Sequence, residues 1–228
     1  MSDDTLRVAT WNVHGLRGDV ATVAQVVRDE ELDVLLVQES GPRRRLRALG
    51  ELLGWIVCSD PWVFPRRRVQ NAVLIRGSLA TAHRSRLVRF RRGSVVHPRG
   101  ALLAEVDERW TAASVHLGLD GAERGRHIAE LVETFEGSSF VGSSGRFVLG
   151  GDLNARPGEP GPSRLATLAT DCWVAAGDGP GATFPSHEPT ARIDYLFAGP
   201  TIRPLRAWTA GGTASDHLMV VAELGWDA

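Results

Sequence analysis

Phe-Val-Leu-Gly-Gly-Asp-Leu-Asn, residues 147–154, is a short apolar run that ends in two glycines and two spaced polar side chains. A continuous apolar run of this length predicts a strand that is covered on both faces. Positions two apart point to the same face of an extended chain, so we expect Asp152 and Asn154 to be presented together. Gly150 and Gly151 would let the backbone turn sharply and approach a ligand closely. This stretch therefore predicts a buried strand whose end holds a polar site.

Similar apolar runs recur on both sides of this stretch and alternate with helical patterns. Apolar residues at helical spacing predict helices near 20–27, 46–53 and 128–135. Strands are predicted at 6–13, 34–37, 55–58, 72–75, 101–106, 111–115, 147–149, 192–197, 202–208 and 218–224. Segments 138–145 and 156–163 are rich in Gly, Ser and Pro and predict loops. Helices interleaved with strands indicate sheets flanked by helices, within one domain over residues 1–228.

The composition is that of an ordinary globular protein, with 43% hydrophobic and 23% charged residues. No apolar run approaches the roughly 18 residues that cross a bilayer. The acidic start of the chain does not resemble a secretory signal, and two cysteines give no disulfide framework. We therefore expect a cytoplasmic protein without a membrane span, and no protein partner can be inferred.

All 26 basic residues are arginine, although the net charge is only −1. Many of the arginines cluster in three segments, at residues 43–47, 66–68 and 84–92. Arginine forks match the geometry of phosphate, so these clusters could hold a polyanionic substrate. Charge runs are more often solvated surface, and a net charge near zero argues against a dedicated nucleic-acid-binding domain. Both interpretations of the clusters stay open.

Polar side chains end or follow several of the predicted strands. Because strand ends meet on one rim, carboxylates, amides and histidines gathered there could hold a hard cation and a phosphate. The residues are Asn12, Glu39, His116, Asp152, Asn154, Asp194, Asp216 and His217. Each alone has an ordinary explanation as a turn residue, a helix cap or a core histidine, and we assign His14 and Ser40 nothing more. The joint occurrence of these residues indicates a site.

In order and spacing, nine pieces of the chain resemble the endonuclease/exonuclease/phosphatase superfamily, which has the DNase I-like fold. They are ATWNVHGLRG (9–18), DVLLVQES (33–40), QNAVLIRG (70–77), PRGALLAEV (98–106), SVHL (114–117), VLGGDLNARPGE (148–159), TFPS (183–186), RIDYLF (192–197) and SDHLMV (215–220). The resemblance covers nearly the whole chain. It implies an α/β fold, a four-layer α/β sandwich of two mixed β-sheets packed face to face with helices outside.

The resemblance also implies a metal site. Glu39 matches the principal Mg²⁺ ligand, with Asn12 and Asp216 in or near the metal shell, and Mn²⁺ is a plausible substitute. Carboxylate oxygens suit this hard ion better than imidazole nitrogens.

The catalytic roles follow from the same resemblance. Asp152 is expected to orient or deprotonate the attacking water, and Asn154 to fix that water and the phosphate. His217 is expected to contact the phosphate with Asp194 hydrogen-bonded to its ring, and His116 to be a second imidazole on the phosphate side. Arg99 and Asn71 match positions that contribute substrate or second-shell contacts.

These roles predict a divalent-metal-dependent phosphoric ester hydrolase, in particular a phosphodiesterase or nuclease acting on DNA or RNA. An alternative is a phosphatase or phosphodiesterase for a small phosphorylated or lipid-derived molecule. A catalytically silent binding module would be favoured by loss of Glu39, Asp152 or His217, and all three are present. Gln70 stands where the family often has glycine, and the abasic-site endonuclease branch is disfavoured by the absence of tryptophan before Asp194. We expect loops at 40–47, 60–70 and 84–99, and expect these loops to decide the substrate.

Overall fold

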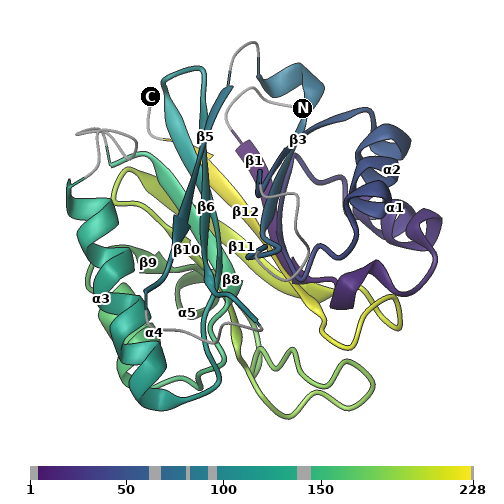
Figure 1. Cartoon of the computed structure of the whole chain (residues 1–228). Coiled ribbons are helices and arrows are strands. Elements are labelled where there is room, and N and C mark those ends of the chain that lie inside the picture. The colour runs from purple at the N-terminus through teal and green to yellow at the C-terminus, as the bar shows by residue number, and fades with distance from the viewer. Residues whose placement is uncertain (1–4, 62–67, 81–82, 92–96, 138–144, 227–228) are drawn as a thin grey trace.

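The computed structural model describes residues 5–61, 68–80, 83–91, 97–137 and 145–226. Within these ranges two six-stranded sheets pack face to face, and helices cover their outer faces (Figure 1). Each sheet contains one parallel strand pair among antiparallel ones, so both sheets are mixed. The four-layer α/β sandwich expected from the sequence is confirmed.

The first sheet is built around the N-terminal strand. Its order is β11 (Ile202–Ala210), β12 (Met219–Trp226), β1 (Thr5–Asn12), β2 (Val34–Gln38), β4 (Ala72–Arg76) and β3 (Trp55–Ser59). Two helices, α1 (Val20–Asp29) and α2 (Arg43–Leu53), cover its outer face (Figure 1). Single-turn 3-10 helices occur at His14–Leu16 and Gly77–Leu79.

The second sheet contains the stretch quoted at the outset. Its order is β5 (His83–Arg89), β6 (Gly100–Val106), β7 (Trp110–His116), β8 (Phe147–Asp152), β10 (Asp194–Ala198) and β9 (Thr170–Asp171). Helices α3 (Gly121–Gly137) and α4 (Pro160–Leu165) cover its outer face (Figure 1), and the short α5 (Cys172–Ala176) contacts β10 and β11. Among the described residues, no helix has the length and apolar character that crossing a membrane requires.

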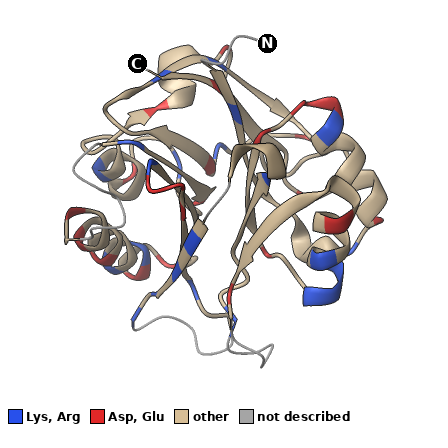
Figure 2. Ribbon diagram, turned by 90° about the horizontal axis from the view of Figure 1, so that it is seen from above, with Lys and Arg blue, Asp and Glu red and all other residues tan. Residues whose placement is uncertain are grey.

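The apolar runs in the central strands are continuous because successive side chains point to opposite faces of the sheet and both faces are covered. In β2, Leu36 points into the core between the sheets, while Leu35 and Val37 point into the core beneath α1 and α2. In β8, Val148 joins the core between the sheets and Leu149 joins the core beneath α3. Both faces of these strands are therefore buried, as such runs predict. Figure 2 shows the charged residues chiefly on helices, edge strands and loops.

The structure corrects three sequence-based expectations. Residues 84–89, expected to lie in the loop at 84–99, belong to β5, an exposed edge strand in which arginines take the place of apolar residues. Residues 160–165 form α4, with Pro160 at its first turn, where proline is tolerated. The expected loop at 138–145 and the arginines at 66, 67 and 92 lie almost wholly outside the described residues.

The third correction concerns the glycine pair, which lies inside β8 rather than in a turn. A Cβ on Gly150 would lie 2.7 Å from Leu196 and 2.9 Å from Leu36, so the packed sheets leave no room there for a side chain. A Cβ on Gly151 would lie 1.8 Å from the carbonyl oxygen of Val115 on the neighbouring strand. The glycines therefore allow close packing of strand and sheet, and Asp152 follows directly at the strand end.

Candidate active site

The topology brings the predicted polar residues to one rim of the sandwich. β1 and β2 are parallel, so Asn12 and Gln38 are register partners and Glu39 follows at the same edge. β7 and β8 are also parallel, which pairs His116 with Asp152. β10 runs antiparallel to β8, so its first residue, Asp194, is also the register partner of Asp152. The strand ends of both sheets thus supply one site.

The segment before β12 is attached to this rim by two hydrogen bonds. The indole nitrogen of Trp11 donates to the carbonyl oxygen of His217 at 2.9 Å. The hydroxyl of Ser215 donates to the carbonyl oxygen of Asn12 at 2.7 Å. Because both bonds reach the end of β1, they fix Asp216 and His217 beside it.

Asp152 is the centre of the polar contacts. Its Oδ2 atom accepts a hydrogen bond from the Asn12 amide at 3.1 Å, and lies 3.3 Å from Nε2 of His116 and 4.0 Å from Nε2 of His217. Burial favours the neutral carboxyl, but the hydrogen bond and charge of His116, with further contributions from His217 and Asn12, lower the pKa of Asp152 to about 2. Asp152 is therefore a buried carboxylate that stays ionised at neutral pH.

Asn154 does not continue an extended chain beyond Asp152, contrary to the expectation. Its φ is 48°, in the left-handed region, and its backbone N–H donates to Oδ1 of Asp152 at 2.9 Å. Its side-chain amide donates to the carbonyl oxygen of Leu117, just after His116, at 3.1 Å. The turn therefore keeps Asn154 bonded to Asp152 and to the residue after His116. Asparagine tolerates this backbone region, and an aspartate side chain readily accepts such a local bond.

His217 and Asp194 form a buried pair. Nδ1 of His217 lies 2.9 Å from Oδ2 of Asp194, which also accepts a hydrogen bond from the Thr183 hydroxyl at 2.5 Å. Burial acts to lower the pKa of His217, but the hydrogen bond and charge of Asp194, with the charges of Asp152 and Asp216, raise it to about 9. His217 is therefore protonated at neutral pH and presents Nε2 toward Asp152.

Arg99 and His116 contact one another beside Asp152. Nη1 of Arg99 lies 2.6 Å from each ring nitrogen of His116. Burial lowers the pKa of Arg99, while the negative charges of Asp152 and Glu39 oppose this shift. A guanidinium near two carboxylates at a partly open rim can engage an anionic phosphate.

Glu39 has the properties expected of a metal ligand. Its side chain is half-buried, and within the described residues its carboxylate accepts no hydrogen bond and forms no ion pair. Asp216, whose side chain is 41% exposed, lies 3.4 Å from Nδ1 of His14, and the amide oxygen of Asn12 accepts a hydrogen bond from the backbone N–H of His14 at 3.1 Å. Oxygen ligands on adjacent strand ends, one of them an unpaired carboxylate, fit a hard divalent cation.

A second group also has the composition of a metal site. Ligand atoms of Asp152, Asp194 and His217 lie within 4.8 Å of one another, and all three residues are buried. Asp194 and His217 already bond to each other, and Asp194 also accepts from Thr183. Oδ2 of Asp194 and Nδ1 of His217 are thus already bonded, whereas Oδ1 of Asp194 is buried without a hydrogen-bond partner in the described residues.

Asn71 lies behind the rim and is fully buried. Its amide nitrogen donates to the carbonyl oxygens of Gly100 at 3.1 Å and Ser114 at 2.7 Å, and so joins β4 of the first sheet to β6 and β7 of the second. Within the described residues its Oδ1 is buried without a hydrogen-bond partner. A substrate contact for Asn71 stays a prediction, whereas its bridging of the sheets is an observed feature.

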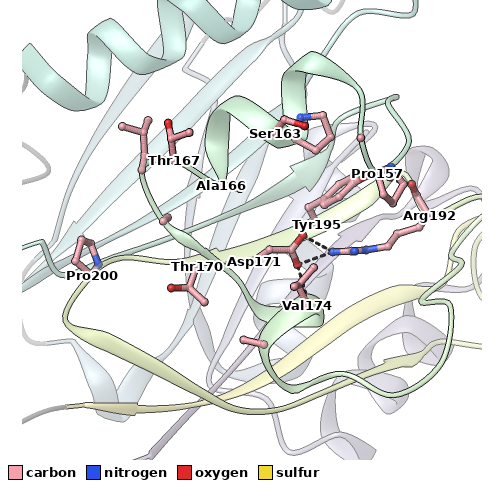
Figure 3. Close-up of a pocket in the computed structure, with 15 residues that line it drawn as sticks. Pro157, Ser163, Ala166, Thr167, Thr170, Asp171, Val174, Arg192, Tyr195 and Pro200 are labelled. Atoms are coloured by element: carbon pink, nitrogen blue, oxygen red, sulfur yellow. Dashed lines mark hydrogen bonds and ion pairs between the residues drawn. The ribbon is translucent and has the colours of Figure 1, made fainter.

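A cavity of about 600 Å³ lies away from these residues, between α4, α5 and the start of β10 (Figure 3). Arg192 reaches into it and forms an ion pair with Asp171, with Nη2 2.5 Å from each carboxylate oxygen. The guanidinium also lies over the ring of Tyr195 at 4.7 Å. These contacts fix the segment that leads into Asp194, and none of the predicted catalytic residues lines the cavity.

Sequence reasoning assigned no role to three residues that contact the site. Thr183 bonds Asp194, the ring of Phe184 lies 4.7 Å from that of His217, and His14 pairs with Asp216. Thr183 and Phe184 belong to the TFPS piece at 183–186, which was the available signal for them. His14 follows the Trp11-Asn12 pair and could not be distinguished from a turn residue.

Comparison with known proteins agrees with the fold and the motifs. A family model described as "Endonuclease/Exonuclease/phosphatase family" matches residues 9–217. An endonuclease/exonuclease/phosphatase family protein from Bacteroides thetaiotaomicron has a TM-score of 0.78 at 16% identity, with 98% of each chain covered. A search of curated proteins finds no match.

Two further solved structures differ in what their descriptions name. A mannosyl-6-phosphatase from Bacteroides thetaiotaomicron VPI-5482 has a TM-score of 0.76 at 16% identity, covering 97% of this chain and 100% of that chain. D. rerio TDP2, complexed with single-strand DNA product, has a TM-score of 0.77 at 17% identity, covering 98% of this chain and 100% of that chain. At these identities the likeness shows the fold alone.

Proposed function

Because this chain belongs to the endonuclease/exonuclease/phosphatase family of phosphoric ester hydrolases, we propose that it is a divalent-metal-dependent phosphodiesterase that cleaves nucleic acid. In this proposal Asp152 activates the attacking water and His217 contacts the phosphate. The observation that carries the proposal is the buried, ionised Asp152, which lies between Asn12, His116 and His217. A carboxylate that stays ionised at neutral pH can align a water molecule for attack, and its low pKa makes this alignment a larger part of its role than acceptance of the proton.

Glu39, Asn12 and Asp216 would hold the cation. Bound there, Mg²⁺ or Mn²⁺ supplies positive charge against the negative charge that develops on the phosphoryl oxygens. Glu39 is the principal ligand in this account, because its carboxylate has no competing partner in the described residues. The group formed by Asp152, Asp194 and His217 takes the proton-transfer role instead.

His217 would donate a hydrogen bond to a phosphate oxygen through Nε2. Asp194 fixes the ring by bonding Nδ1 at 2.9 Å, so Nε2 is left for the substrate. Because its pKa is raised to about 9, His217 carries a positive charge at neutral pH, which favours an anionic phosphoryl group. Arg99, His116 and Asn154 would supply further donors around the same phosphate.

The likeness to TDP2 bound to single-strand DNA product supports a nucleic-acid substrate. The likeness to a mannosyl-6-phosphatase supports a second candidate, a phosphatase for a small phosphorylated molecule. The net charge of −1 also favours this second candidate, since nucleic-acid-binding surfaces are usually strongly basic. The nuclease and the phosphatase would use the same catalytic and metal-binding residues and would differ in the part of the substrate that binds around the phosphate.

The test is hydrolysis by the purified protein of plasmid DNA, single-stranded RNA, bis-p-nitrophenyl phosphate and mannose 6-phosphate. Each substrate is incubated with Mg²⁺, with Mn²⁺ and with EDTA, beside the His217→Ala variant. Cleavage of DNA or RNA that is lost in EDTA and in the variant would establish the nuclease. Turnover of mannose 6-phosphate alone would establish the phosphatase instead, and metal-independent turnover would contradict both.

A further inference from the structure

The backbone that carries Glu39 is held in an unfavourable conformation. Glu39 has a φ of 49° and Gly41 a φ of 63°, both in the left-handed region, which is disfavoured for residues with a Cβ. A Cβ on Gly41 would lie 2.1 Å from the carbonyl oxygen of Gly15, so the two loops touch backbone to backbone. Such a conformation persists only where the surroundings impose it.

Three hydrogen bonds with neighbouring segments help to hold residues 39–41 in this backbone conformation. The carbonyl oxygen of Glu39 accepts from the N–H of Gly15 at 2.8 Å. The N–H of Ser40 donates to the carbonyl oxygen of Gln70 at 2.8 Å, and the N–H of Gly41 donates to the side-chain oxygen of Gln70 at 3.2 Å. The side chain of Gln70 therefore bonds directly to this loop.

Arg68 supplies two further contacts to this loop. Nη1 donates to the carbonyl oxygen of Gly41 at 2.8 Å, and Nη2 lies 3.4 Å from the hydroxyl of Ser40. The residue is only 4% exposed, and its Nε is buried without a partner in the described residues. Burying a cation with an unmet donor costs stability, which its bonds to Gly41 and Ser40 only partly offset.

The charges around Arg68 support that view. Burial lowers the pKa of Arg68, the negative charge of Asp60 raises it, and the charge of Arg43 lowers it again. Asp60 is fully buried and accepts a hydrogen bond from the N–H of Val69 at 2.6 Å, while its carbonyl oxygen accepts from Arg43 at 2.7 Å. The negative charge of Asp60 thus offsets part of the cost of burying the guanidinium that bonds Ser40 and Gly41.

We propose that Arg68, with Gln70, is a positioning residue that holds Glu39 in the conformation in which it binds the divalent cation. The inference rests on the proposed function, in which Glu39 is the principal metal ligand. Partners that orient a metal ligand commonly contribute about 10- to 100-fold in metal affinity. Arg68 would act on binding of the metal and would not touch the substrate.

The test is titration calorimetry of the purified full-length chain with Mn²⁺ alone, without substrate. Wild type is compared with Glu39→Gln, Arg68→Met and Arg68→Lys. We expect Glu39→Gln to lose the site and Arg68→Met to raise the Kd for Mn²⁺ by about 10- to 100-fold. Lysine keeps the charge but cannot reach both acceptors in a fork, so Arg68→Lys should fall between wild type and Arg68→Met.

Arg76→Met is the matched control. Arg76 also donates to backbone carbonyl oxygens, those of Leu32 at 2.7 Å and Glu31 at 3.2 Å, and pairs with Asp33, but at the opposite end of β4. The Arg76→Met variant should have a lower melting temperature than wild type but the same Kd for Mn²⁺. If Arg68→Met behaves like this control, the positioning role is contradicted while the Glu39 site stands.

Gln70→Gly keeps the inference testable if Arg68→Met does not fold. Gln70 has a φ of 60°, which glycine adopts freely, so the change removes the side-chain acceptor without backbone strain. We expect a folded protein whose Kd for Mn²⁺ is raised by about tenfold. An unchanged Kd in this variant would overturn the inference. If Glu39→Gln binds Mn²⁺ like wild type, the metal assignment itself fails, and the positioning role fails with it.

Discussion

Nδ1 of His217 lies 2.9 Å from Oδ2 of Asp194, and both side chains are buried. Asp194 begins β10 of the second sheet, whereas His217 lies just before β12 of the first sheet. The pair therefore joins the two sheets at the rim where the other site residues gather. It also raises the pKa of His217 to about 9, which links the fold directly to the charge state of the site.

Asp194→Asn should reveal this link in the pH dependence of catalysis. Without the carboxylate, the pKa of His217 should fall from about 9 toward its ordinary value of about 6.5. We expect kcat/KM to drop by about 10²-fold or more, and its alkaline limb to move to lower pH. A pH–rate profile measured on bis-p-nitrophenyl phosphate checks this. A variant that retained the wild-type alkaline limb would show that Asp194 does not control His217.

The same pair should make stability depend on pH. The pKa of His217 is about 9 in the folded protein and about 6.5 in the unfolded chain, so the folded state holds the proton more tightly. The contribution of His217 to the free energy of unfolding is fully present below about pH 6.5 and is lost as pH rises through about 9. We expect wild type to lose roughly 3 kcal/mol of unfolding free energy relative to His217→Gln over this window.

Urea unfolding of both metal-free proteins in EDTA, at several pH values, measures this difference. The subtraction removes the contributions of titrating groups that do not interact with His217, and leaves that of His217 together with its carboxylate partners Asp152 and Asp194. A difference that stayed constant, or grew with pH, would contradict the raised pKa of His217.

Asn71→Ala tests the polar link between the sheets. The change leaves the carbonyl oxygens of Gly100 and Ser114 buried without their donor. We expect a loss of roughly 2–4 kcal/mol in unfolding free energy, measured by urea unfolding at neutral pH. KM should stay near the wild-type value below the melting temperature if the residue acts through packing. A raised KM in a stable variant would instead support the substrate contact that the sequence predicts for Asn71.

Much of the fold could be predicted from the sequence, because both faces of the central strands are buried. The runs in β2 and β8 are continuous and apolar, and helical spacing identified α1 and the second half of α3. β5 could not be predicted, because an exposed edge strand needs no apolar alternation and this one carries arginines instead. α4 and α5 are too short, at six and five residues, to show a helical period.

The candidate site could be predicted as a set of residues but not as a network. The resemblance identified Asp152, Asp194 and His217, which the structure brings together. It could not show that Asn154 adopts a left-handed conformation, or that Arg68 bonds to Ser40 and Gly41. These contacts join segments far apart in the chain, and spacing along the sequence carries no information about them.

Arg99 should contribute to substrate binding through its planar fork. It lies 2.6 Å from the ring nitrogens of His116 and close to the charges of Asp152 and Glu39. We expect Arg99→Gln to lower kcat/KM by about 10- to 100-fold, and Arg99→Lys to recover only part, because an ammonium cannot bind phosphate in two places. Steady-state kinetics on the preferred substrate check this. Full activity in Arg99→Lys would show that only the charge matters.

The central claim is that Asp152 activates water for attack on a phosphate ester. The most direct test is the kcat of Asp152→Asn in saturating Mg²⁺, measured on the substrate that wild type turns over fastest. We predict that kcat falls by about 10²-fold or more, with the far-ultraviolet circular dichroism unchanged and Mn²⁺ binding at the Glu39 site retained. A folded, metal-binding Asp152→Asn protein with near wild-type turnover would contradict the account.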